Sequence, residues 1–145
     1  MPEEISKGPP RSFYVISGAA LIWNLFGVLS YIGRVTASEA TLAAMPDLQR
    51  AYAENAPAWE TATFAIATNA GALGCLFLLL QRSWAYPVLI ASFVAVLVQN
   101  FYGYAIGGAV EVFGPVGVVF SVAVMVIGAL LVWYSKGANE KGWLK

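Results

Sequence analysis

The residues best suited to chemistry are amides and aromatic side chains that interrupt otherwise apolar stretches of the chain. Asn24 and Asn69 fall near the middle of two such stretches, and Gln99 and Asn100 lie outward of the centre of a third. At membrane depth, no water is at hand to pair with such groups, so they bond to protein or to a solute. The candidate residues for a solute path or for buried polar packing are Asn24, Asn69, Gln99, Asn100, Tyr102, Tyr104, Trp59 and Glu60.

Two interpretations of these residues remain open. On neighbouring antiparallel helices, Asn24 and Asn69 would share one depth and could hydrogen-bond, and such contacts stabilise membrane bundles by about 0.6–2 kcal/mol. Alternatively, the polar side chains line a cavity that opens outward, with amides at its floor. Arg34, Glu60 and Glu111 continue the polar trend but belong to span ends, where water and headgroups can solvate them. Packing is the favoured interpretation.

Several kinds of site lack their residues. The chain has no histidine and one cysteine, Cys75, so it offers no Ser-His pair, no C-x-x-C redox motif and no Cys/His zinc site. Asp47 is the only aspartate, which leaves no carboxylate cluster for magnesium. No carboxylate, lysine or histidine falls at mid-span, which disfavours proton antiport. We therefore expect a non-catalytic protein without cofactor or metal.

The elements that must position these residues are apolar helices. Hydrophobic residues make up 59% of the chain and charged residues 11%, whereas soluble domains carry about a quarter charged residues. The net charge of +0 gives no reason to expect a nucleic acid partner. Runs near the ~20 residues that cross a bilayer predict an all-α, four-helix transmembrane bundle in one domain, with the lipid bilayer as its partner. They cover residues 13–35, 57–81, 84–106 and 115–135.

The lysines and arginines predict the orientation of the bundle. Cytoplasmic segments of membrane proteins carry an excess of these residues, so the richer side is expected to face inward. We therefore expect a multi-pass protein of the bacterial inner membrane with both termini in the cytoplasm. The richer side holds Lys7, Arg11, Arg82, Lys136, Lys141 and Lys145, and the other side holds Arg34 and Arg50.

The first span could instead be a secretory signal peptide, because basic residues precede it and small residues follow it. Its apolar run is longer than the ~7–15 residues of a signal core, and it contains Asn24 and Arg34. We expect it to be retained.

Residues 38–56 form the longest connection between spans and are predicted to fold as an amphipathic helical hairpin or bent helix on the outer face. Ser38 can cap a first helix, and Pro46 can begin a second. We expect a structural lid; a partner-binding site and a lid over an outward-opening cavity are the alternatives. The apolar stripe of this segment comprises Leu42, Met45, Leu48 and Tyr52.

Over most of its length, the chain resembles a group of short, four-span bacterial membrane proteins that are often labelled "sugar transporter". That resemblance implies a neutral solute, which amides and aromatic faces can hold without a charge. Four helices alone usually fill their own centre, so transport would require a homodimer. The motifs that carry the resemblance are Leu21-Ile22-Trp23-Asn24-Leu25-Phe26-Gly27-Val28, Ala56-Pro57-Ala58-Trp59, Gly71-Ala72-Leu73-Gly74-Cys75, Trp84-Ala85, Glu111-Val112-Phe113-Gly114-Pro115 and Lys141-Gly142-Trp143-Leu144-Lys145.

The leading hypothesis is a small non-catalytic carrier of a neutral solute such as a sugar. The alternative is an accessory subunit of a larger membrane complex, docked by faces of small residues such as Gly71 and Gly103.

Overall fold

Helices account for nearly all of the regular structure because lipid offers no partner to free backbone groups. The computed structural model describes residues 8–145, so Lys7 lies outside the described residues. Four segments are long and apolar enough to cross a bilayer, namely α1, α4, α5 continued by η1, and α6. The prediction of an all-α, four-helix membrane bundle is confirmed. The elements are α1 (Arg11–Val35), α2 (Glu39–Ala44), α3 (Asp47–Asn55), α4 (Ala58–Leu79), α5 (Ala85–Phe101), the π-helical turn η1 (Tyr102–Ile106) and α6 (Ala109–Glu140).

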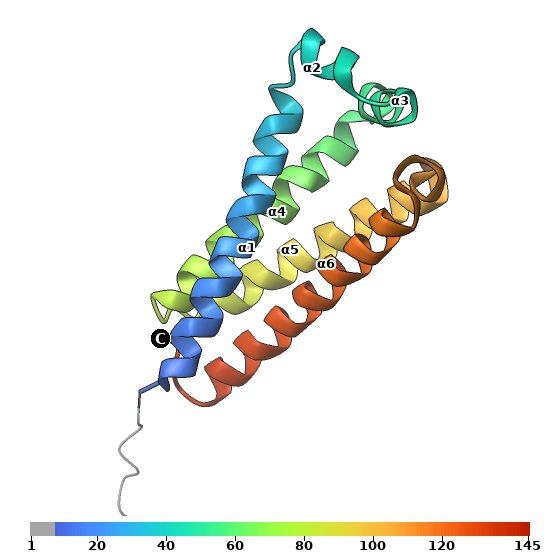
Figure 1. The fold of residues 1–145 in the computed structure, drawn as a ribbon. Helices are drawn as coiled ribbons and strands as arrows, with labels where there is room; N and C mark the ends of the chain where they lie inside the picture. The colour runs from blue at the N-terminus through green and yellow to red at the C-terminus, as the bar shows by residue number, and fades with distance from the viewer. Residues whose placement is uncertain (1–7) are drawn as a thin grey trace, which may run out of the picture.

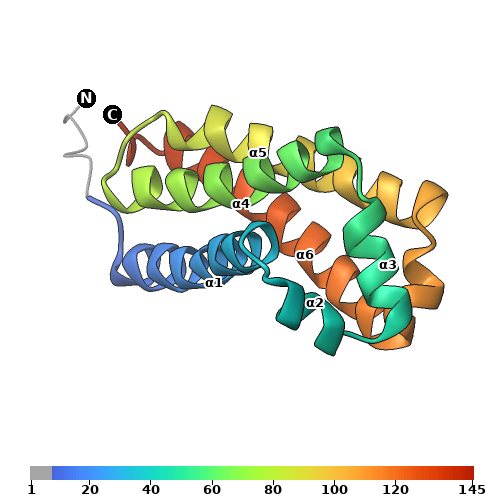
Figure 2. The same cartoon turned by 90° about the horizontal axis from the view of Figure 1, so that it is seen from above.

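The long helices pack in chain order, with α1 on α4, α4 on α5, and α5 on α6. α1 and α6 therefore form the two edges of the set, and they diverge toward the α2–α3 end (Figure 1). At the opposite end the helices converge near the C-terminus and the α4–α5 turn. We call these the wide end and the narrow end. Figure 2 shows that α2 and α3 lie across the wide end, where α3 contacts α6.

The narrow end is packed shut. Phe13 and Leu78 are fully buried there with Leu144. The Phe13 ring meets the Trp143 ring edge-on, with centroids 5.6 Å apart. The backbone N–H of Lys145 donates to the carbonyl of Gln81 at 2.8 Å, which ties the end of the chain to the α4–α5 turn.

The connection at the wide end folds as two short helices, as its sequence predicts. The Ser38 hydroxyl accepts a hydrogen bond from the Thr41 N–H at 3.2 Å and caps α2. Pro46 is the N-cap of α3. Two short helices with a proline between them can therefore cross over the bundle within a short connection.

Two irregularities interrupt the third and fourth spans near the wide end. α5 passes into the π-helical turn at Tyr102. Within α6, Gly114 has φ 68° and ψ −166°, a conformation that is essentially restricted to glycine. Pro115, where we expected the fourth span to start, follows this break, and the structure adds a short helical piece from Ala109 before it.

Candidate functional site

The space between the diverging helices contains two adjoining cavities. The wide-end cavity has a volume of about 520 Å³ and lies among α1, α4, α5 and α6 beneath α2 and α3. The mid-bundle cavity has a volume of about 250 Å³ and is lined by the same four long helices. Both are lined by Ser30, Gln99, Phe120 and Val124. The expectation that four helices fill their own centre is therefore wrong, because α1 and α6 diverge, and a single chain forms the cavity without a second protomer.

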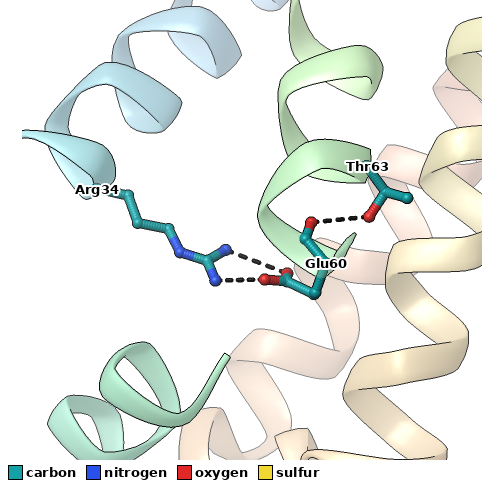
Figure 3. Close-up of polar contacts among 3 residues, drawn as sticks. All are labelled: Arg34, Glu60 and Thr63. Carbon is teal, nitrogen blue, oxygen red and sulfur yellow. Dashed lines mark hydrogen bonds and ion pairs between the residues drawn. The ribbon is translucent and has the colours of Figure 1, made fainter. Parts of the chain in front are cut away.

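A buried ion pair lies in the wall of the wide-end cavity. Arg34 donates to both carboxylate oxygens of Glu60, with 3.1 Å between Nη1 and Oε1 (Figure 3). The side chain of Glu60 is 0% exposed and that of Arg34 is 21% exposed. Our expectation that Glu60 is solvated at a span end is wrong, because the guanidinium and the surrounding helices take the place of water.

The helix ends favour this pair. Glu60 is in the first turn of α4, and Arg34 is in the last turn of α1. A carboxylate is stabilised near the positive N-terminal end of the helix dipole and a cation near the negative C-terminal end. The guanidinium also lies over the Phe64 ring, 5.2 Å from its centroid.

Three polar residues of the third span line the same cavity. Gln99 lines both cavities, and the described part of the chain provides no hydrogen bond to its amide, which leaves donor and acceptor available to a solute. Asn100 donates from Nδ2 to the Val96 carbonyl at 2.8 Å, which leaves its side-chain oxygen to accept a hydrogen bond from a solute. Tyr104 adds a phenol. These groups and the ion pair are the polar part of a lining that is otherwise largely apolar.

Asn24 lines the mid-bundle cavity. Its Nδ2 donates to the Ala20 carbonyl at 2.8 Å and contacts the Cys75 sulfur at 3.4 Å. A Cβ at Gly71 would lie 2.2 Å from the Asn24 oxygen, so this glycine is needed to admit the amide.

Asn69 is on the opposite side of α4 from the bundle interior. Its side chain is exposed, and its Nδ2 donates to the Ala65 carbonyl of its own helix at 2.8 Å. The buried face of α4 includes Ala67 and Gly71, each two residues from Asn69 and thus about half a turn away. The expected Asn24–Asn69 hydrogen bond is therefore not formed.

Tyr102 and Trp59 pack together outside the cavity lining. Their ring centroids are 5.3 Å apart in an edge-to-face contact, and Tyr102 also packs against Tyr52 of α3. Both residues therefore support the lid rather than the cavity. Of the eight candidates, Asn24, Glu60, Gln99, Asn100 and Tyr104 line the cavities, and Asn69, Tyr102 and Trp59 do not.

Most of the apolar stripe of the α2–α3 segment faces the wide-end cavity. Leu42, Met45 and Tyr52 line the cavity, whereas Leu48 is exposed. Burial raises the pKa of the Tyr52 phenol to about 12, and the negative charge of Glu60 adds to the rise. The segment thus has the position of a lid, with a protonated phenol on its inner side.

The small residues of the third span also pack inside the chain. A Cβ at Gly107 would lie 2.7 Å from the Tyr52 ring, and one at Gly103 would lie 3.3 Å from the Tyr52 oxygen. The absence of side chains at these two glycines lets the lid tyrosine lie against η1. Gly103, like Gly71, therefore supports a contact within this chain, and not one with another subunit.

Arg34, Gln49, Tyr52 and Ser121 line the wide-end cavity but were not among the predicted candidates. The charges carried a signal, because Arg34 ends the first span and Glu60 begins the second, so antiparallel packing brings opposite charges to one level. Nothing in the sequence indicates which residues of α6 face the cavity.

No group of three or more His, Cys, Asp or Glu side chains in residues 8–145 lies close enough together to hold a metal ion. Comparison of the chain with protein-family models, with curated proteins and with solved structures found no match, so the resemblance drawn from its motifs stays a prediction.

Proposed function

We propose that this membrane protein binds a small uncharged polar solute in the wide-end cavity and carries it across the bilayer. The observation that supports this most directly is the charge of the lining. Arg34 and Glu60 are the charged side chains that line the cavity within residues 8–145, and they neutralise each other. A charged solute would have to enter without a counter-ion and would compete with a formed pair.

The size and chemistry of the cavity suit a hydroxylated molecule. A volume of about 520 Å³ falls within the range of about 300–1,000 Å³ that is usual for small-molecule sites. Gln99, Asn100 and Tyr104 offer donors and acceptors, and Phe64 and Phe113 offer aromatic faces. A sugar needs both kinds of contact, in agreement with the family that the motifs suggest.

We further propose that the wide end faces outward from a bacterial inner membrane. The narrow end carries Arg11, Arg82 and three C-terminal lysines, whereas Arg34 at the wide end is already paired. An excess of lysine and arginine favours the cytoplasmic side. The solute would then enter beneath the α2–α3 lid and leave through the closed narrow end after a rearrangement.

Solute counterflow into proteoliposomes would test this proposal. A panel of labelled neutral monosaccharides should exchange, whereas a uronate and an amino sugar of similar size should not. Replacing Gln99 with leucine removes an amide from both cavities and should weaken exchange by about tenfold or more.

Asn69→Leu is the matched control, because Asn69 is exposed on the far side of α4. This substitution should change solute exchange by about twofold at most. An equal loss in both variants, or equal exchange of charged analogues, would count against the site. A stoichiometric foreign subunit in native mass spectra, together with no exchange, would favour the accessory-subunit alternative.

A further inference from the structure

The two adjoining cavities differ in the charge of their linings. The wide-end cavity is lined by the Arg34–Glu60 pair and by Asn100. The mid-bundle cavity is lined by Phe93 and Ile127 among other apolar side chains, and no charged side chain of residues 8–145 lines it. Since the cavities share part of their lining, a molecule that fills both would meet charged groups at one end only.

Most polar groups around the mid-bundle cavity are already paired within the chain; Gln99, which this cavity shares with the wide-end cavity, is an exception. Ser92 donates from its hydroxyl to the Ala67 carbonyl at 2.6 Å, and Thr68 donates to the Phe64 carbonyl at 2.9 Å. Water in a cavity needs two to four polar partners, so a mostly apolar space with paired polar groups holds it poorly. A free sugar in the wide-end cavity would leave this space unfilled.

The mid-bundle cavity also opens toward the bilayer. Phe26 of α1 and Phe120 of α6 both line it, yet they are 64% and 60% exposed. They belong to the two edge helices that diverge in Figure 1. The rings of Trp23 and Phe120 meet across this opening, with centroids 6.0 Å apart. Side chains that are exposed on membrane helices face acyl chains, so a molecule dissolved in the bilayer can reach the cavity sideways.

We propose that the two cavities together bind one neutral amphiphile. Its hydroxyl-bearing head lies beside Arg34, Glu60 and Gln99, and its apolar chain lies in the mid-bundle cavity. An amphiphile enters from the bilayer between α1 and α6, whereas a free sugar would enter from water beneath the α2–α3 lid. This proposal rests on the proposed function, because it specifies the class of solute that the site takes.

Photo-cross-linking of the unmodified chain tests where the apolar part binds. The probe is an octyl glucoside that carries a diazirine at the end of its alkyl chain, added below its micelle-forming concentration to the protein in phosphatidylcholine nanodiscs. We expect saturable labelling of Phe93 and Ile127, which line the mid-bundle cavity. Excess octyl glucoside should displace the label, and anionic octyl phosphate should not. Labelling confined to the exposed Val122 and Val126, without displacement, would overturn the proposal.

A pair of neighbouring substitutions provides the second measurement. Ile127→Trp fills the mid-bundle cavity and should weaken octyl glucoside binding about tenfold or more, whereas Val126→Trp should change it by about twofold at most, because Val126 is exposed and is not part of the lining. Both variants are first compared with the unmodified protein by size-exclusion chromatography. If Ile127→Trp does not fold, the cross-link map of the unmodified protein decides.

Binding of labelled free glucose separates the two proposals. The amphiphile is supported if octyl glucoside binds more tightly than glucose and if Ile127→Trp weakens the binding of octyl glucoside but not that of glucose. Saturable glucose binding without saturable octyl glucoside binding overturns the amphiphile and leaves the proposed function standing. Saturable binding of neither compound overturns both.

Discussion

The buried ion pair makes a sharp prediction about stability. Replacing Arg34 with methionine keeps an apolar stem of similar length but leaves the Glu60 carboxylate without its partner, in a position where it is 0% exposed. Removing one member of a buried pair costs about 3–5 kcal/mol, because the remaining charge is neither paired nor hydrated. Neutral interhelical hydrogen bonds in membranes contribute about 0.6 kcal/mol on average. We therefore expect Arg34→Met to destabilise the protein several times more than loss of an ordinary polar contact.

The two partners should not be equivalent. Glu60→Leu leaves an arginine that is 21% exposed and whose long stem lets the guanidinium reach water or headgroups. We expect a smaller loss for this variant than for Arg34→Met. The double variant Arg34→Met/Glu60→Leu removes both charges and should recover most of the loss, since apolar replacements of a buried pair are often neutral or stabilising.

Unfolding in mixed micelles of dodecyl maltoside and increasing SDS, followed by tryptophan fluorescence, gives the free energies for this double-mutant cycle. A matched polar deletion, Asn24→Leu, provides the reference for a neutral contact. The reasoning fails if Arg34→Met lies within about 0.5 kcal/mol of the unmodified protein, or if the double variant is no more stable than Arg34→Met alone.

Two further predictions concern packing and the lid. Gly74→Ala places a Cβ 2.6 Å from Cγ of the buried Leu89 and should reduce the free energy of unfolding by about 1–3 kcal/mol. Gly18→Ala is the control, because nothing lies within 4 Å of its added Cβ, and it should not reduce the free energy of unfolding. Equal losses for the two variants in the same assay would refute this packing. The pKa of Tyr52, about 12 in the folded protein against 10.0 ordinarily, means that its contribution to stability is complete below pH 10 and is lost as pH rises toward 12. Phenolate absorbance should show a titration near pH 12 that Tyr52→Phe removes and that Glu60→Gln shifts to lower pH; an unshifted titration would contradict the proximity of that carboxylate.

The sequence predicts the helices because a bilayer leaves few alternatives to them. Runs of apolar residues determine the spans. Ser38 and Pro46 occupy the predicted N-cap positions of the two short helices, and the apolar stripe faces the cavity except at Leu48. The hydrogen bonding of a helix backbone and the hydropathy of a segment are local properties, so both can be predicted without knowledge of the tertiary structure.

The side of each helix that points into the bundle could not be predicted in the same way. α4 is apolar on all sides, so no periodicity distinguishes Asn69, on the outside, from Asn24's partner Cys75, on the inside. The cavity depends on the divergence of α1 and α6, a property of packing between distant parts of the chain. Arg34 and Glu60 could be placed at one level, but their burial follows only once the lid and the neighbouring helices are in place.

The closure of the narrow end has a consequence for biosynthesis. Residues 143–145 pack onto Phe13 and onto the α4–α5 turn, so a segment that follows the fourth span completes a core that begins in the first span. The narrow end therefore stays unsealed until residues 143–145, which the ribosome adds after the fourth span, have packed against it. A chain that stops before Trp143 should insert its four spans but leave Phe13, which is 0% exposed in the structure, open to hydroxyl-radical footprinting.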